Sequence, residues 1–320
     1  MPARAKRYTF LCLLPFLLWS CSTIHGRATV RPHAEGQPKD FLIADLPKIE
    51  KLENLAYLRN AAVMSAAVYV DAPLTTRLDV LKTQGTEEQK EQLALFPDGW
   101  IDDTKVPRPA LLPGKRATPD LTYRLFVSPE GQVPRVALLA FRGTHIKADW
   151  YSNLRWIDSW IPGVEDHYEQ TERVTPAIID YIRQQYGANA LVFATGHSLG
   201  GGLAQTAAYR ACGEIPTVFA FDSSPVTKHR ARNLCNGQSP KFFYRVFEQS
   251  EILSYARFLV RLALGLRESN PHIAEIKVHL FDGIGITAHS MQHLSECLDK
   301  ELSGQVAQST SSCNLKGLKP

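Results

Sequence analysis

The chain has 320 residues, of which 44% are hydrophobic and 21% charged, so it excludes long disorder and is long enough for one large domain with a buried sheet. The formal net charge is +4, but Arg4, Lys6 and Arg7 lie in the first 20 residues, which contain no acidic side chain. The remainder is nearly neutral, so charge gives no sign of nucleic-acid binding.

Residues 1–20 have the pattern of a signal peptide. A positive start precedes an apolar stretch from Phe10 to Trp19, which is shorter than the roughly 20 residues of a membrane-spanning helix. The stretch ends in Leu18-Trp19-Ser20-Cys21, which resembles a bacterial lipobox, where the cysteine is acylated. Because Ser22 is not aspartate, the resemblance implies an outer-membrane lipoprotein of the cell envelope, anchored through Cys21. A plain secretory signal and an uncleaved anchor are the alternatives.

The segment before the domain is polar and contains scattered glycine and proline. This composition predicts a flexible tether over residues 21–40, followed by a single domain over 41–320. Helical patterns cover 41–69 and, more briefly, 87–95, and a proline-rich loop is expected over 107–119.

After residue 119 the patterns predict alternating strands and helices. Apolar runs typical of strands lie at 121–127, 135–141, 190–195, 217–221, 242–247 and 276–281. An apolar stripe predicts a helix over 174–186, and small residues predict another over 201–211. This alternation predicts an α/β fold with a mostly parallel central sheet and helices on both faces.

Four cysteines lie in the predicted domain: Cys212, Cys235, Cys297 and Cys313. An even number in a secreted protein is consistent with disulfides, and pairing of nearest neighbours would join Cys212 to Cys235 and Cys297 to Cys313. Buried free thiols are the alternative. None of them has the spacing of zinc ligands, so no metal site is expected.

The run Gly196-His197-Ser198-Leu199-Gly200 has the G-x-S-x-G form of a nucleophile elbow. It follows an apolar strand and opens a predicted helix. Side chains at positions 196 and 200 would crowd the sharp turn that this connection requires. Ser198 is therefore the predicted nucleophile of a serine hydrolase.

Two backbone N–H groups are the predicted donors of an oxyanion hole. One belongs to Leu199, which follows the nucleophile. The other belongs to Thr144, in Ala140-Phe141-Arg142-Gly143-Thr144 at the end of a buried strand. An ordinary strand-ending turn is the alternative for this second segment.

The segments Phe141–Thr144, Asp149-Trp150 and Gly196–Gly201 together resemble the class 3 lipases, the fungal-lipase-like α/β-hydrolases. The resemblance is weak over residues 50–70 and clear over 121–300. It implies an α/β-hydrolase fold, a Ser-Asp-His triad, esterase chemistry on acylglycerols or phospholipids, and no cofactor.

The catalytic histidine of this fold follows the serine and the acid in the chain. His289 lies in a loop after the last predicted strand, where the family's histidine occurs, and His293 is the second candidate. His279 falls inside the predicted strand and is interpreted as a strand side chain.

The acid of the triad has three candidates. The segment Arg245–Leu253 matches the family's Asn-x-x-Asp-x-Val shape with Glu251 at the aspartate position. A glutamate can serve, because the acid only orients the imidazole and stabilises its charge. Asp222, after the preceding strand, is the alternative, and Glu248 is a weaker one.

Three of the five tryptophans, Trp150, Trp156 and Trp160, lie within residues 145–162, where class 3 lipases have a lid. Packing in the core is the alternative for them, and residues 255–266 form a second amphipathic candidate for lipid contact. The sequence thus predicts a lipid-anchored serine carboxylic ester hydrolase, a lipase or phospholipase that forms an acyl-enzyme. An esterase or thioesterase for soluble substrates, or a non-catalytic envelope lipoprotein with the same fold, are the alternatives.

Overall fold

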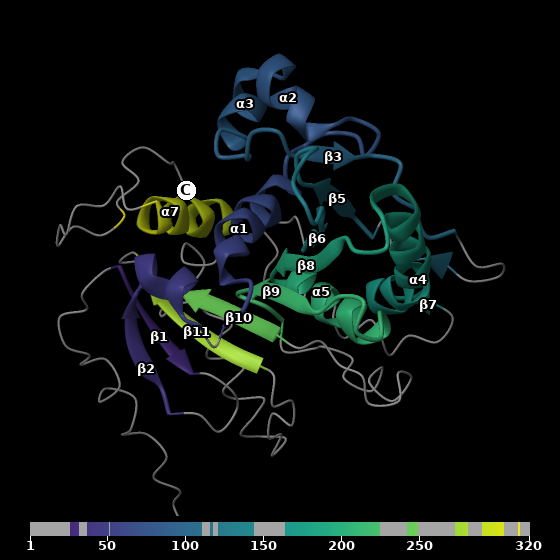
Figure 1. Cartoon of the computed structure of the whole chain (residues 1–320). Helices are drawn as coiled ribbons and strands as arrows, with labels where there is room; N and C mark the ends of the chain where they lie inside the picture. Colours follow the sequence, from purple (N-terminus) through teal and green to yellow (C-terminus); the bar gives the residue numbers. More distant parts are fainter. Residues whose placement is uncertain are drawn as a thin grey trace, which may run out of the picture.

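The structure is a computed structural model and describes residues 26–31, 37–50, 52–110, 116–117, 121–143, 164–224, 242–248, 273–280, 290–303 and 313. Within these residues a central sheet carries helices on its two faces (Figure 1). The structure is therefore of the predicted α/β class.

Nine strands of the described chain form the central sheet, in the order β2-β1-β11-β10-β9-β8-β6-β5-β3. They are β1 (Arg27–Arg31), β2 (Lys39–Leu42), β3 (Ile101–Asp103), β5 (Tyr123–Val127), β6 (Val136–Phe141), β8 (Leu191–His197), β9 (Thr217–Phe221), β10 (Phe242–Glu248) and β11 (Ile273–His279). The short strands β4 (Arg116–Ala117) and β7 (Val164–Glu165) pair separately.

The sheet is mixed, which corrects the prediction of a mostly parallel one. Strands β6, β8, β9, β10 and β11 run parallel at its centre. The outer pairs at both edges are antiparallel. A short connection such as that between β5 and β6 permits only antiparallel pairing, because a parallel crossover needs a dozen residues or more.

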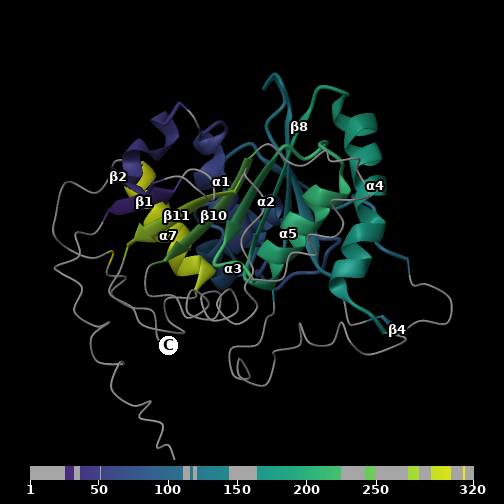
Figure 2. The same cartoon turned by 90° about the horizontal axis from the view of Figure 1, so that it is seen from below.

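Helices cover both faces of the sheet, as predicted. Helices α1 (Leu58–Ala67) and α7 (Met291–Leu302) share one hydrophobic core with the sheet, and α4 (His167–Tyr186) and α5 (Leu199–Arg210) share the other. Figure 2 shows α5 beside α4 on their common face. Shorter helices are α2 (Leu78–Gln84) and α3 (Glu87–Gln92), with 3-10 helices η2 (Ile43–Lys48) and η3 (Leu55–Tyr57).

The central strands are apolar throughout because both of their faces are covered. Leu138 and Leu139 are neighbours in β6, yet they belong to opposite cores and both are fully buried. Successive side chains of a strand point to opposite faces, so a strand between two helix layers has no polar side. The predicted strands from residue 121 onward are confirmed within a few residues.

The predicted tether over residues 21–40 is wrong where it overlaps β1 and the start of β2. Strand β1 pairs with β11 along its whole length, and Ala28 and Val30 are buried. The alternation of these two apolar residues with arginine and threonine is too short to stand out in the sequence. The helical pattern over 41–69 also divides, into η2, η3 and α1.

The predicted disulfide between Cys297 and Cys313 is confirmed, with Cα atoms 5.8 Å apart. It fixes Cys313 to α7, and the N–H of Cys313 donates to the carbonyl of Leu280 at 3.0 Å. Cys212 is also disulfide-bonded, whereas Cys235, its predicted partner, lies outside the described residues. In the described part of the chain, no helix is both long and apolar enough to span a bilayer.

Candidate active site

Ser198 is the single residue between the end of β8 and the start of α5. Its backbone has φ 57° and ψ −124°, a region that costs a residue with a side chain on the order of 1–3 kcal/mol. Its N–H donates to the Phe221 carbonyl at 3.0 Å, and its carbonyl accepts from the Ser224 N–H at 2.9 Å. Serine at a helix start usually caps the helix, but within the described residues the Ser198 hydroxyl makes no such bond to α5. The elbow is thus held by backbone hydrogen bonds and not by a side-chain cap.

The glycines around Ser198 are required by close backbone packing. A Cβ at Gly196 would lie 2.4 Å from the carbonyl oxygen of Gly200, and one at Gly200 would lie 2.2 Å from that of Phe141. At Gly201 it would lie 2.7 Å from Cβ of Ser223. The predicted crowding at positions 196 and 200 is therefore confirmed.

The turn after β6 packs directly against the elbow. A Cβ on Gly143 would lie 2.6 Å from the His197 carbonyl oxygen and 3.3 Å from Cβ of Ser198. The N–H of Arg142 donates to the Thr122 carbonyl at 2.9 Å, and the N–H of Gly143 donates to the Tyr69 hydroxyl at 2.9 Å. Both N–H groups therefore already have acceptors. The next residue, Thr144, carries the predicted oxyanion donor and lies outside the described residues.

Leu199 is the first residue of α5. The first N–H groups of a helix have no acceptor within that helix, and they point out of its N-terminus, where negative charge is stabilised. Leu199 thus lies at the N-terminus of α5, and its role as an oxyanion donor stays a prediction.

Tyr69, which lies just after α1, is a site residue that the sequence analysis missed. Besides accepting from Gly143, its hydroxyl lies 3.3 Å from Nδ1 of His197 and 3.5 Å from the His197 carbonyl oxygen. Burial raises the pKa of this hydroxyl, so it stays protonated. The only sequence signal for Tyr69 was its place at the end of a helical pattern.

Two of the candidate acids lie at the carboxyl ends of central strands, as Ser198 does, and both are fully buried. Asp222 follows β9 with φ 40°, and its Oδ1 accepts the N–H of Glu248 at 3.2 Å. Glu248 ends β10, and its Oε2 accepts the N–H of Leu280 at 3.1 Å. Neither is a solvated surface carboxylate. Glu251 lies outside the described residues.

The histidine candidates divide in the same way. His279 ends β11, as predicted, with Nδ1 3.6 Å from Oε1 of Glu248. His293 is half-buried on α7, and burial lowers its pKa. His289 lies outside the described residues, directly before Ser290, whose side chain caps α7.

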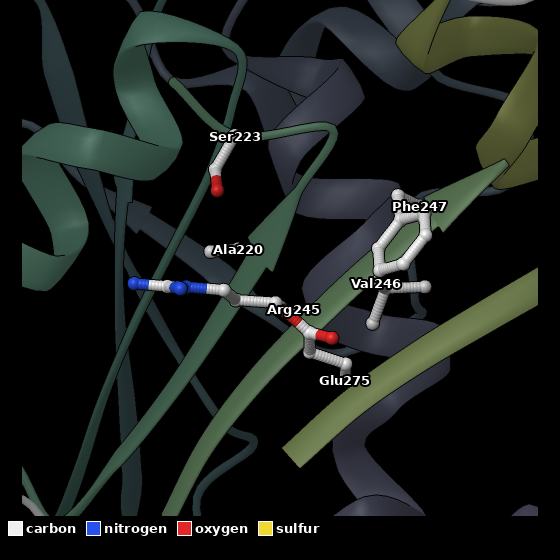
Figure 3. Close-up of a pocket in the computed structure, with 6 residues that line it drawn as sticks. All are labelled: Ala220, Ser223, Arg245, Val246, Phe247 and Glu275. Atoms are coloured by element: carbon white, nitrogen blue, oxygen red, sulfur yellow. The ribbon is translucent and has the colours of Figure 1, made fainter. Parts of the chain in front are cut away.

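A buried network of polar side chains contacts the first turn of α5, next to the elbow. Nε and Nη2 of Arg245 donate to the Gln205 amide oxygen at 3.2 and 3.0 Å, and the Gln205 amide nitrogen donates to the Gly201 carbonyl at 3.1 Å. Figure 3 shows Arg245 and Ser223 lining a small cavity. Its volume of about 10 Å³ suits one water molecule and not a lipid, so this network is structural.

The remaining predicted site residues are not tested by the structure. Trp150, Trp156, Trp160 and Cys21 lie outside the described residues. Across the described ranges, no group of three or more potential ligands is arranged to hold a metal ion.

The described fold and site define an α/β protein with a serine on a strand-to-helix elbow, the geometry of a nucleophile. Residues 60–233, more than half of the chain, match the model of a phospholipase-like family, the Tle-like phospholipase domain, and the chain belongs to this family. A search of curated proteins found no match. The matched range contains Tyr69, Ser198 and Asp222. Family membership supports lipid ester hydrolysis of the phospholipase type.

Proposed function

We propose that this protein is a serine phospholipase that cleaves acyl esters of phospholipids through Ser198. The observation that carries the proposal is the backbone of Ser198, with φ 57° and ψ −124° between β8 and α5, in a chain of a phospholipase-like family. A backbone strained at one serine, with three surrounding glycines packed against other backbone or Cβ atoms, is characteristic of functional sites.

We also propose that the fold is that of an α/β-hydrolase, in the manner of class 3 lipases. The five parallel strands support this, because the nucleophile follows β8 and the segments after β10 and β11 come later in the chain. That order matches serine, acid and histidine in α/β-hydrolases. Glu251 and His289 occupy those two segments in the sequence.

The reaction follows from these roles. His289 takes the proton of Ser198 while Oγ attacks the ester carbonyl, and the N–H groups of Leu199 and Thr144 stabilise the oxyanion. Collapse breaks the ester bond, the alcohol leaves with the proton from His289, and the acyl group stays on Ser198. Water, activated by the same histidine, then releases the fatty acid. Each oxyanion donor stabilises the transition state by about 3 kcal/mol.

We assign the acid to Glu251 and keep Asp222 as its alternative. Asp222 and Glu248 both accept backbone N–H groups from neighbouring strand ends. Such bonds hold the sheet edge together, which gives these two carboxylates a structural role without a triad. Asp222 remains the rival because it follows the strand next to β8, and its backbone is strained like that of Ser198.

We propose that the protein is an envelope lipoprotein, anchored through Cys21, with the tryptophans of 145–162 forming a lid. The Cys297–Cys313 disulfide supports an oxidising compartment. The position at which the N-terminal part of the chain enters the sheet supports the proposed lipid anchor. The N–H of Gly26 donates to the carbonyl of His279 at 3.0 Å, so β1 begins at the carboxyl ends of the parallel strands, where Ser198 also lies. Five residues from Cys21 to Gly26 reach at most about 18 Å. A lipid on Cys21 would hold this end of the sheet close to the membrane.

A substrate panel tests the proposed function. Purified protein is assayed on phospholipid vesicles, emulsified triacylglycerol and short soluble esters, alongside the Ser198→Ala variant. We expect fatty acid release from phospholipid by the wild type only. Activity confined to triacylglycerol or to soluble esters would contradict the substrate, and equal activity of Ser198→Ala would contradict the nucleophile. In the same assay Glu251→Gln is expected to lose far more activity than Asp222→Asn; the reverse would move the acid to Asp222.

A further inference from the structure

The hydroxyl of Tyr69 connects the two segments that must meet in the oxyanion hole. It accepts the N–H of Gly143 at 2.9 Å on one side, and on the other it lies 3.3 Å from Nδ1 and 3.5 Å from the carbonyl oxygen of His197. Gly143 directly precedes Thr144, and His197 directly precedes Ser198. The tyrosine therefore contacts the neighbour of a predicted oxyanion donor and the neighbour of the predicted nucleophile.

We propose that Tyr69 is a positioning residue that sets the distance between the turn after β6 and the serine elbow. This inference rests on the proposed function, because the geometry it fixes matters only if Ser198 attacks an ester. An oxyanion donor acts through its preorganised position, so a group that holds the donor's turn contributes to the rate without touching the substrate.

The position of Tyr69 is itself fixed by buried contacts. Its N–H donates to the Ala66 carbonyl at 3.0 Å, which makes it an extension of α1. Helix α1 is joined to β8 by a buried hydrogen bond between the hydroxyls of Ser65 and Thr195, 2.7 Å apart. Thr195 lies in β8, three residues before Ser198. The helix, the strand and the tyrosine thus form one frame around the elbow.

The space around Gly143 explains why a hydroxyl suits this place. An added Cβ on Gly143 would lie 2.6 Å from the Tyr69 hydroxyl, 2.6 Å from the His197 carbonyl oxygen and 3.3 Å from Cβ of Ser198. All three groups surround one point, so the Tyr69 hydroxyl, the turn and the elbow pack together without room for a side chain on Gly143. Burial also raises the pKa of the Tyr69 hydroxyl, so it does not ionise in the working range of a serine hydrolase.

The test compares Tyr69→Phe with Tyr244→Phe, a matched control. Tyr244 is buried in β10 and donates through its hydroxyl to the carbonyl of Glu53 at 2.5 Å, so each variant loses one hydrogen-bonded hydroxyl and no ring. The readouts are kcat and KM on an ester that the wild type hydrolyses, and the rate of covalent labelling of Ser198 by a fluorophosphonate.

We expect Tyr69→Phe to lower kcat and the labelling rate by about tenfold, with KM within about twofold of the wild type. The loss should be the same across the pH range of the assay, because the raised pKa keeps the Tyr69 hydroxyl protonated throughout that range. Tyr244→Phe should keep the wild-type kcat. A wild-type kcat in Tyr69→Phe overturns the proposal, and so does unfolding of Tyr69→Phe when Tyr244→Phe folds, because the hydroxyl would then serve the fold alone.

The Ser198→Ala variant separates this inference from the proposed function. If the wild type neither hydrolyses esters nor becomes labelled, or if Ser198→Ala is equally active, the proposed function fails and the role of Tyr69 fails with it. If Ser198→Ala is inactive while Tyr69→Phe matches the wild type, only the role of Tyr69 is wrong.

Discussion

At the residue scale, the elbow depends on glycines, whose lack of a side chain lets the backbone pack closely. Gly196, Gly200 and Gly201 are each so close to neighbouring atoms that one added carbon would collide. In an ordinary helix an alanine would be preferred to glycine by about 1 kcal/mol, so the glycines in α5 are there for packing and not for helix formation. The tight contact between α5 and the end of β6 is what brings the turn after β6 to Ser198.

Gly200→Ala tests this packing. The new Cβ would lie 2.2 Å from the carbonyl oxygen of Phe141, so the helix and the strand must separate. We expect destabilisation by about 1–3 kcal/mol in urea unfolding and loss of Ser198 labelling. Gly131→Ala is the control, because that glycine has φ +91° and nothing within 4 Å of the added carbon. It should lose stability through backbone strain but keep its labelling, and a labelled, stable Gly200→Ala would refute the packing argument.

The residues of the elbow could be predicted from the sequence because G-x-S-x-G is a local pattern whose physical reason is local. Tyr69 could not, because its contacts join residues more than 70 positions apart and no periodicity marks them. Arg245 was missed for the same reason. A buried arginine in an apolar run is recognised only when its partner, Gln205, is known.

At the element scale, a buried ion pair fixes the edge of the sheet and the segment before α2. Nη1 of Arg124, in β5, donates to Oδ2 of Asp102 in β3 at 2.5 Å, with the two side chains 2% and 1% exposed. Arg124 also donates to the carbonyls of Ala72, Pro73 and Thr76. Burial raises the pKa of Asp102, and Arg124 opposes that rise.

Asp102→Asn tests this pair. It keeps the shape of the side chain but leaves the charge of Arg124 buried without its counterion, so we expect a loss of about 3–5 kcal/mol in the free energy of unfolding. Lys90→Ala is the control, because it removes an exposed ion pair with Glu87 and should change stability by less than about 0.5 kcal/mol. Similar small effects in both variants would show that the pair does not hold this edge.

The central strands were predictable because they are continuous apolar runs, whereas the edges were not. Strand β1 has two buried side chains among polar ones, and its pairing with β11 joins residues about 250 positions apart in the chain. The sheet is mixed because the outer strands β1, β2, β3 and β5 pair in antiparallel fashion. A local pattern indicates that a strand exists, but its partner and direction depend on contacts distant in sequence.

At the scale of the whole molecule, β1 begins at the same end of the parallel strands at which the candidate site lies. Strand β1 starts opposite His279 at the carboxyl end of β11, and Ser198 follows the carboxyl end of the parallel strand β8. Under the proposed lipid anchor at Cys21, the site would be held toward the membrane that contains its substrate.

A longer connection tests this arrangement. We expect insertion of 20 glycine and serine residues between Ser22 and Thr23 of the lipidated protein to slow hydrolysis of the anchoring vesicle's own phospholipid by about tenfold, because effective concentration falls with linker length. Hydrolysis of a short soluble ester should stay unchanged and serves as the control. An unchanged rate on the vesicle would mean that the anchor does not orient the site.

The central claim is that Ser198 is an activated nucleophile, and covalent labelling tests it most directly. Folded wild-type protein is treated with a fluorophosphonate, digested, and the modified residue located by mass spectrometry. We predict one modification, on Ser198, which is absent from Ser198→Ala and from protein unfolded before treatment. No modification of the folded wild type, or equal modification of Ser198→Ala, would contradict the claim.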